Sequence, residues 1–321
     1  MKCILRIVLA MSFIASLVAC DKPSGNLSAT AVSVSGAGKK ASPSIVFDGN
    51  RAFEYLKAMV EFGPRPSGSK ANGATQKFIL QTLTRQGIAV EEEPFLATTP
   101  RGKIPMNNLI AKIPGASSEV IVLGGHYDTK LFETIRFVGA NDGGSSAAFL
   151  LEIAGILKRR KNSLTIWCVF FDGEEAVREW TDTDSVYGSR HFVQHMKSSN
   201  RLSKIKAMLL VDMIGDRDLN LLKESNSTSW LVDILWDSGA GMGFRKNFLP
   251  ESFSIGGDDH FPFLQEGIPA VDLIDFDFGF ANAYWHSEQD TVDKCSPRSL
   301  QIVGDTVLKA LPFIESRFLQ K

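Results

Sequence analysis

Short apolar runs that stop at an acidic residue or a histidine constrain the fold of this chain most strongly. The runs are typical of strands buried on both faces, and segments with helical periodicity separate most of them. Strands joined by helices predict an α/β fold with a mostly parallel sheet that helices cover on both faces. The expected strands are residues 90–98, 107–113, 120–123, 164–171, 207–211 and 270–274.

The predicted helices come from apolar residues that recur with a period of 3.6. No repeat of fixed period occurs, and no break in composition divides residues 45–321. We therefore expect a single catalytic domain over these residues. The helices are expected around residues 53–62, 69–86, 147–157, 230–236 and 300–318.

The first twenty residues have the pattern of a secretory signal. A positive start is followed by the apolar stretch 7–18 and by small residues before Cys20. The ending Leu17–Cys20 resembles the lipobox of bacterial lipoproteins, which implies that Cys20 is lipidated and becomes the new amino terminus. An ordinary signal peptide with a chance cysteine is the alternative.

Residues 21–44 are rich in Ser, Gly, Ala and Lys, which predicts a flexible tether. No later segment is long and apolar enough to span a membrane. We thus expect an exported bacterial lipoprotein on the periplasmic or cell-surface side of a membrane, held there only through Cys20. Its state is expected to be monomeric.

Charge and cysteine content exclude several classes of protein. The formal net charge is -1, which argues against a nucleic-acid partner, since such proteins carry a basic excess. The four cysteines form no CxxC pair, which argues against a cysteine zinc site and a disulfide framework. Cys168 lies in an apolar run and is expected to be a buried free thiol.

Polar side chains gather where the predicted strands stop. His126 and Asp128 follow one run, Glu174 and Glu175 follow another, and Asp212 follows a third. The carboxyl ends of parallel strands form a crevice in which sites are built. Because converging carboxylates repel one another unless a cation or a proton is present, this pattern favours a bound metal.

The candidate metal ligands are Asp142, Glu175 and one histidine. His286 is the best remaining donor, because it lies in a Gly- and Asn-containing loop after a strand. Imidazole nitrogen with carboxylate oxygen suits zinc, and three protein ligands with one open position make a catalytic site. The plainer alternatives are a helix cap at Asp142 and a solvated loop pair at Glu174–Glu175.

Several motifs resemble known families in a consistent order over roughly residues 50 to 315. Gly139–Gly143, Phe171–Glu175 and the late histidine resemble the co-catalytic zinc exopeptidase clan, specifically its aminopeptidase branch. A second set resembles the animal-type glutaminyl cyclases of that clan. This set comprises Trp180, Tyr187–His191, Leu210–Gly215, Asp258–Leu264, Gly267–Pro269 and Trp285–His286.

This resemblance implies a zinc aminopeptidase-like mixed sheet of six strands, flanked by helices, and a glutaminyl-peptide cyclotransferase. Such an enzyme converts the N-terminal glutamine of a peptide to pyroglutamate and releases ammonia. The resemblance implies one zinc, with Glu174 as general base and general acid. The zinc ligands would be Asp142, Glu175 and His286.

The remaining site residues are also implied by the resemblance. Asp212 and Asp258 would form a hydrogen-bonded acidic pair near the substrate amine. The pocket for the glutamine side chain would be walled by Trp180, Phe278 and Trp285. The chain departs from the animal-type cyclases at Asp272, where they carry a histidine, and segment 279–284 looks longer.

Two other functions stay open from the sequence. In a two-zinc aminopeptidase, His126 and Asp212 would hold a second zinc, with Asp142 bridging the two ions and Asp128 orienting His126. A metal-free binding lipoprotein with the same fold would be expected to have lost a ligand or the base. Glu174 and the three candidate ligands are all present, which argues against this last function.

Overall fold

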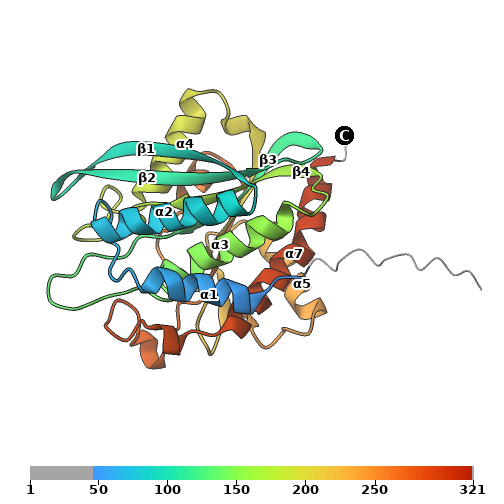
Figure 1. Ribbon diagram of the computed structural model, residues 1–321. Helices are drawn as coiled ribbons and strands as arrows, with labels where there is room; N and C mark the ends of the chain where they lie inside the picture. The colour runs from blue at the N-terminus through green and yellow to red at the C-terminus, as the bar shows by residue number, and fades with distance from the viewer. Residues whose placement is uncertain (1–45, 320–321) are drawn as a thin grey trace, which may run out of the picture. The chain divides into compact units, whose positions relative to one another are not determined.

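One twisted six-stranded sheet organises the computed structural model, which describes residues 46–319 (Figure 1). The strand order is β1-β2-β4-β3-β5-β8. The pairs β4–β3, β3–β5 and β5–β8 are parallel, whereas the pairs β1–β2 and β2–β4 are antiparallel. The strands are β1 (Ala89–Thr99), β2 (Gly102–Ile113), β3 (Ser117–His126), β4 (Leu164–Phe171), β5 (Ile205–Asp212) and β8 (Ala270–Ile274).

The mixed, mostly parallel sheet confirms the predicted fold class, and all six predicted strands are present. Strand β2 begins earlier than expected, because residues 102–106 pair with β1 in a hairpin. The predicted signal segment 1–20 and tether 21–44 lie outside the described residues. Among residues 46–319, no helix combines the length and the apolar character that a membrane span needs.

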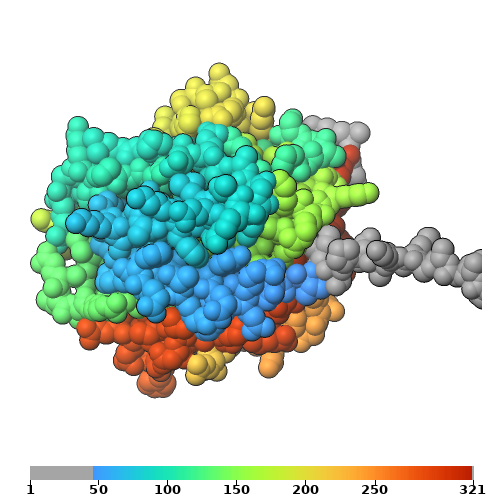
Figure 2. Space-filling view, in the orientation of Figure 1, coloured from blue at the N-terminus to red at the C-terminus, as the bar shows by residue number. Residues whose placement is uncertain are grey.

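Helices cover both faces of the sheet, and two hydrophobic clusters fill the layers between them. Along β3, Ile121 and Leu123 belong to one cluster, while Val120 and Val122 belong to the other. This alternation is the period of two that a strand imposes. The larger cluster lies under α1 (Gly49–Val60), α2 (Lys70–Arg85), α3 (Gly144–Leu157), α5 (Ser229–Gly241) and α7 (Pro297–Leu319). Figure 2 shows α1 and α2 over this face.

The opposite face is covered by α4 (Tyr187–Ser198) and α6 (Phe261–Gln265). These two helices were not among the expected elements, nor was the short parallel pair β6 (Leu221–Glu224) and β7 (Phe248–Phe253). Three single turns of 3-10 helix complete the elements of residues 46–319. They are η1 (Leu202–Lys204), η2 (Phe280–Asn282) and η3 (Val292–Lys294).

Side-chain caps fix the starts of two helices. The Asp48 carboxylate accepts a hydrogen bond from the backbone N–H of Arg51 and caps α1, and the Ser69 hydroxyl does the same for α2 through Asn72. Helix α3 differs, because all fourteen of its residues are buried. It packs against the sheet and against α1 and α2, which fixes the loop that carries Asp142 directly before it.

Candidate metal centre and pocket

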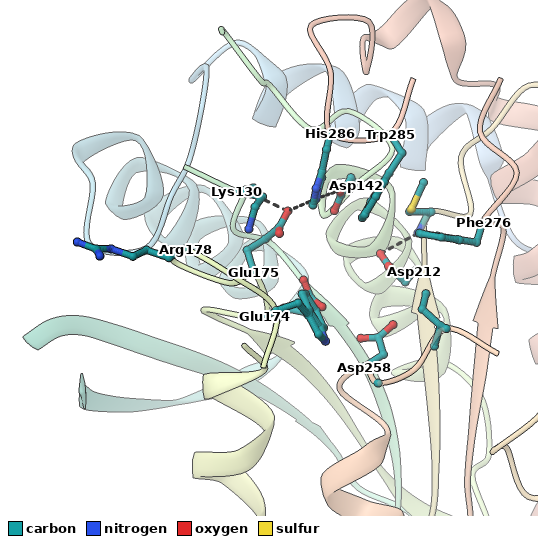
Figure 3. Close-up of a pocket in the computed structure, with 14 residues that line it drawn as sticks. Lys130, Asp142, Glu174, Glu175, Arg178, Asp212, Asp258, Phe276, Trp285 and His286 are labelled. Carbon is teal, nitrogen blue, oxygen red and sulfur yellow. Dashed lines mark hydrogen bonds and ion pairs between the residues drawn. The ribbon is translucent and has the colours of Figure 1, made fainter. Parts of the chain in front are cut away.

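The candidate site lies at the carboxyl ends of the parallel strands, as the sequence pattern predicts. His126 ends β3, Asp212 ends β5, and Glu174 and Glu175 follow β4. Asp212, Glu174 and Glu175 line a cavity of about 390 Å³ (Figure 3). Its lining includes Asp142 from the start of α3 and His286 from the loop after β8.

Asp142, Glu175 and His286 meet at one side of this cavity. The Nε2 atom of His286 lies 3.3 Å from Oδ2 of Asp142 and 3.2 Å from Oε1 of Glu175. Two ligands of one tetrahedral zinc ion, each about 2.1 Å from it, lie about 3.4 Å apart. The buried Oδ2 of Asp142 and Oε2 of Glu175 have no hydrogen-bond partner among the described residues. This donor set fits zinc, and all three side chains line the cavity.

The charges in this cluster show the need for a cation. Burial lowers the pKa of His286, but the Glu175 and Asp142 carboxylates outweigh burial and raise that pKa to about 10. Burial and the nearby Asp142 charge raise the pKa of Glu175. A bound dication would compensate the same negative charge without a proton.

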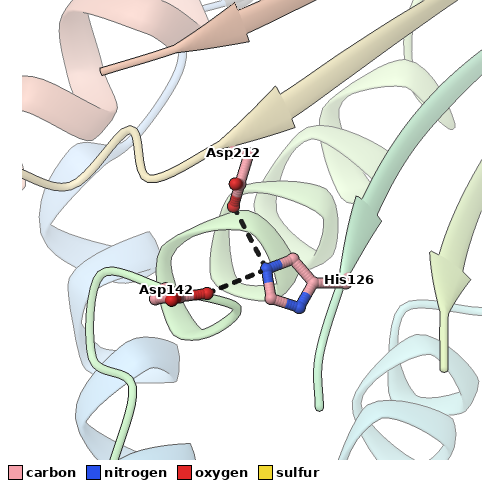
Figure 4. Close-up of side chains that lie close together, drawn as sticks. All are labelled: His126, Asp142 and Asp212. Carbon is pink, nitrogen blue, oxygen red and sulfur yellow. Dashed lines mark hydrogen bonds and ion pairs between the residues drawn. The ribbon is translucent and has the colours of Figure 1, made fainter. Parts of the chain in front are cut away.

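A second donor set shares Asp142 with the first. Nε2 of His126 lies 3.1 Å from Oδ1 of Asp212 and 3.2 Å from Oδ1 of Asp142 (Figure 4). Asp142 thus directs one carboxylate oxygen to each histidine, as the two-zinc alternative requires. His126, however, is fully enclosed and does not line the cavity.

The buried Asp128 carboxylate contacts residues of both donor sets. Its Oδ1 lies 3.4 Å from Nδ1 of His126 and accepts a hydrogen bond from the backbone N–H of Glu174 at 3.2 Å. Its Oδ2 accepts from the backbone N–H of Glu175 at 3.4 Å. One buried carboxylate therefore fixes the histidine ring and the loop that carries the two glutamates.

Glu174 lies on the cavity wall next to the first donor set and is not one of its three members. Burial raises the pKa of Glu174 well above its ordinary value; His126 opposes this shift, and the Asp258 and Glu175 charges add to it. A carboxyl group with a raised pKa can both take and return a proton near neutral pH. Glu174 has the environment that general acid–base chemistry requires.

Asp212 and Asp258 both line the cavity, but their expected hydrogen bond is absent from the described residues. Oδ1 of Asp212 is used by His126, by the hydroxyl of Ser146 and by the backbone N–H of Met213. Burial and the charge of Asp212 raise the pKa of Asp258 well above its ordinary value. The two carboxylates are electrostatic neighbours, and the hydrogen-bonded pair expected from the resemblance is replaced by separate contacts.

The aromatic wall differs from the expected one at a single position. Trp180 and Trp285 line the cavity and are 45% and 37% exposed, so they lie at its open side. Phe278 is fully buried, packs against Met213 and Ile274, and does not line the cavity. Its expected place is taken by another residue of the same loop, Phe276, whose ring meets Trp285 edge-on with centroids 4.9 Å apart.

Several supporting residues were not expected from the sequence. Lys130 lines the cavity, and its backbone N–H donates to Oε1 of Glu175 at 3.0 Å. Asp290 accepts hydrogen bonds from the backbone of the loop that carries Asp142. Beneath that loop, the buried Arg65 guanidinium donates to the carbonyls of Val138 and Gly139. Asp290 lies between Gln and Thr, and Arg65 lies between two prolines. Neither sequence context contains a motif that indicates these roles.

Comparison with known proteins adds the family. The model of Peptidase family M28 matches residues 108–311. A glutaminyl-peptide cyclotransferase-like protein of Bos taurus is 31% identical over 267 residues, which are 73% of this chain and 67% of the bovine protein. A glutaminyl-peptide cyclotransferase of Drosophila melanogaster is 30% identical over 71% of this chain and 70% of the fly protein.

The chain belongs to peptidase family M28, in its glutaminyl cyclase branch. The crystal structure of a glutaminyl cyclase from an Acidobacteriales bacterium superposes on this M28 protein with a TM-score of 0.81 and 39% identity. The match covers 88% of this chain and all of that structure. The fold and the family expected from the sequence motifs are thereby confirmed.

Proposed function

We propose that this M28 protein is a glutaminyl-peptide cyclotransferase with one zinc, held by Asp142, Glu175 and His286. The cavity carries the proposal, because this donor set, the buried Glu174 and an aromatic wall open into the same space. The cyclotransferases among its relatives support the same activity. The substrate is the amino terminus of a peptide that begins with glutamine.

The chemistry follows from the groups around the cavity. Zinc on the three ligands would polarise the oxygen of the side-chain amide as a Lewis acid. The neutral α-amine of the substrate forms a bond from its nitrogen to the side-chain amide carbon, and Glu174 takes the proton that this nitrogen then loses. The carbon–nitrogen bond of the amide breaks, and Glu174 returns the proton to the departing ammonia. No water is consumed, so the pocket needs to hold only one reactant in a ring-closing geometry.

Acidic and aromatic side chains of the cavity would recognise the amino terminus of the substrate. The carboxylates of Asp212 and Asp258 give the inner wall a negative potential, which favours the substrate ammonium group before it loses its proton. Trp180, Phe276 and Trp285 offer ring faces and edges to a flat amide side chain. The exposed tryptophans lie where the rest of the peptide would leave the pocket.

The enclosure of His126 favours one catalytic metal over two. His126 has almost no exposed surface and does not line the cavity, so only Asp142 and Asp212 of the second donor set face the substrate space. A bridging hydroxide between two zinc ions must reach the substrate to cleave a peptide bond. For a cyclase, His126 and Asp212 act instead as a buried pair that orients the shared ligand Asp142.

Export as a lipoprotein is part of this proposal and rests on the sequence alone. The lipobox at Leu17–Cys20 and the polar stretch 21–44 support an enzyme that is tethered through a lipidated Cys20, and its proposed state is a monomer. Mass measurement of the mature amino-terminal peptide, with Cys20→Ala as the comparison, tests this part. An unmodified amino terminus on the mature protein would contradict the tether and leave the activity untouched.

The experiment that tests the activity compares two peptides. The purified protein, with its bound zinc counted, is incubated with one peptide that starts in glutamine and one that starts in leucine. We expect the first peptide to lose ammonia with its chain intact and the second to stay unchanged. Release of the first residue would support an aminopeptidase, and no change in either peptide would support a binding protein.

A further inference from the structure

A second group of metal-type side chains lies behind the cavity, on the far side of Asp258. Asp258, His260 and Asp272 each offer a ligand atom, and these atoms lie within 4.8 Å of one another. Asp272 comes from the edge strand β8, and His260 directly precedes α6. All three side chains are buried. This group takes no direct part in the proposed reaction except through Asp258.

The polar atoms of this group lack partners to an unusual degree. Among the described residues, both ring nitrogens of His260, both oxygens of Asp272 and Oδ2 of Asp258 have no hydrogen-bond partner. A buried polar group without a partner loses its hydrogen bonds to water and destabilises the fold. One ligand atom from each of the three residues lies within 4.8 Å of the others, so a single occupant between them would satisfy them together.

Charge points to a cation as that occupant. No lysine or arginine within residues 46–319 forms an ion pair with Asp258 or Asp272, and the basic groups near them are His260 and, for Asp258, His126. Burial, the charges of Asp258, Asp212 and Glu224, and a hydrogen bond that a protonated Asp272 makes with the Asp258 carboxyl group raise the pKa of Asp272 well above its ordinary value, so a cation would replace a proton that these two carboxyl groups share. Buried carboxylates in this state require protons or a metal ion.

The distances distinguish a metal ion from a protonated histidine. Nδ1 of His260 lies 3.8 Å from Oδ2 of Asp272, which is too long for a hydrogen bond. An imidazolium held between two carboxylates would draw them into hydrogen-bond range. Two atoms that share an ion at about 2.1–2.3 Å lie roughly 3.0–3.8 Å apart, depending on the coordination angle.

Glu224 completes the pattern from the other side of the ring. Its Oε2 lies 3.3 Å from Nε2 of His260. Hydrogen bonds from Asn226 and Ser227 hold the Glu224 carboxylate in place. A carboxylate that faces the free nitrogen of a histidine ligand, and so fixes the ring, is a regular feature of metal sites.

We propose that Asp258, His260 through Nδ1, and Asp272 bind a second divalent cation, with Glu224 orienting the histidine. The ion lies behind the reaction pocket and has a structural role. It compensates the charges of Asp258 and Asp272 and fixes Asp258, whose other oxygen accepts a hydrogen bond from the backbone N–H of Asp259. Because it concerns binding and not turnover, the proposal does not depend on the reaction assigned to the pocket.

The test counts metal ions per chain. The protein is stripped with a chelator and reloaded with Zn²⁺, and in parallel with Mn²⁺, and the bound metal is measured by atomic emission. We expect Asp272→Asn to bind one ion fewer than the unmodified protein, with Glu224→Gln losing about 10–100-fold in affinity for that ion. Asp275→Asn, a buried carboxyl three residues away, serves as the control and should keep the full count.

A separate variant keeps this site apart from the catalytic one. His286→Ala should lose the pocket ion and keep the ion at Asp272, whatever reaction the pocket performs. An equal count in Asp272→Asn and unmodified protein would overturn the proposal. If Asp272→Asn fails to fold, crystals of the unmodified protein grown with zinc decide the matter. An anomalous peak between His260 and Asp272 supports the site, and a peak only at His286 overturns it.

Discussion

Asp290 accepts a hydrogen bond from the backbone N–H of Asp142, with 3.1 Å between the nitrogen and Oδ2. The other oxygen of Asp290 accepts from the backbone N–H of Asn141 at 2.7 Å. Asp290 lies four residues after His286, so this one carboxylate ties together the two loops that carry proposed zinc ligands. The distance between those ligands is therefore set by a buried contact that never touches the metal.

We predict that Asp290→Asn weakens zinc binding by about 10–100-fold, because an amide can replace only one of the two acceptors. Titration of the metal-free protein with zinc measures this directly. Asp293→Asn is the matched control, since Asp293 is exposed and close in the same loop. Equal zinc affinity in Asp290→Asn and the control would show that the loops hold their places without this contact.

Substitutions of the neighbouring Glu174 and Glu175 should separate the loss of proton transfer from the loss of metal binding. Glu174→Gln is expected to lower kcat by about 10²–10⁴-fold and to retain zinc, because it removes the proton carrier and no ligand. Glu175→Gln is expected to lose zinc and activity together. Parallel measurement of bound zinc and of ammonia release distinguishes the two variants. Zinc loss in Glu174→Gln would contradict the assigned roles.

Two phenylalanines in one loop offer a similar comparison. Phe276→Ala removes part of the pocket wall and should raise KM by roughly tenfold with little change in stability. Phe278→Ala leaves a cavity in a buried cluster and should lower the free energy of unfolding by about 3–5 kcal/mol. Kinetics and denaturant unfolding of both variants test the assignment. The opposite pattern would restore Phe278 as the pocket residue.

The core of the sheet and the ligand positions were predictable for the same reason. A strand such as β4 is buried on both faces, so its sequence is a continuous apolar run, and the first polar residue after it marks the strand end. Glu174 and Glu175 follow that end at once. Parallel strands bring their ends to one edge, so three segments far apart in the sequence meet there.

The missed elements carry weaker signals. Helix α4 contains two His and two Ser, and only half of its residues are buried, so its apolar face is narrow. Strand β6 has four residues, too few for an alternating pattern. Both form because the sheet already offers an apolar surface, which tertiary packing supplies and local sequence does not.

The direction of side chains within loops could also not be predicted from the sequence. The backbone N–H of Phe278 donates to the side chain of Asn282, so the loop folds back and Tyr284 packs edge-on against Phe278 at 5.4 Å. Because the loop folds back, Phe278 points into the buried cluster and Phe276 lines the cavity. Asp212 is likewise turned toward His126 and away from a hydrogen bond to Asp258. Such choices depend on contacts between distant segments.

Asp275 gives a prediction for stability and pH. Burial raises the pKa of Asp275 to about 7, with hydrogen bonds from Asn220 and Asp277 opposing this shift. The folded state therefore binds a proton more tightly than the unfolded chain, whose aspartate titrates near pH ~4. The resulting stabilisation is fully present below that pH and is lost as pH rises toward 7, by about 1 kcal/mol per pH unit.

Asp275→Asn removes this titration, and its stability should depend less on pH between about 4 and 7. Denaturant unfolding of both proteins at several pH values, with saturating zinc, gives the two slopes. Identical slopes for the variant and the unmodified protein would mean that the pKa of Asp275 is not raised in the folded protein.

The most direct test of the central claim follows heavy oxygen from the solvent. A peptide that starts in glutamine is incubated with the zinc-loaded protein in heavy-oxygen water, and the products are weighed by mass spectrometry. Attack by the peptide's own amine predicts an intact pyroglutamyl peptide, one released ammonia and no heavy oxygen in the product. Free glutamine that carries heavy oxygen would show that water is the nucleophile and would contradict the cyclotransferase.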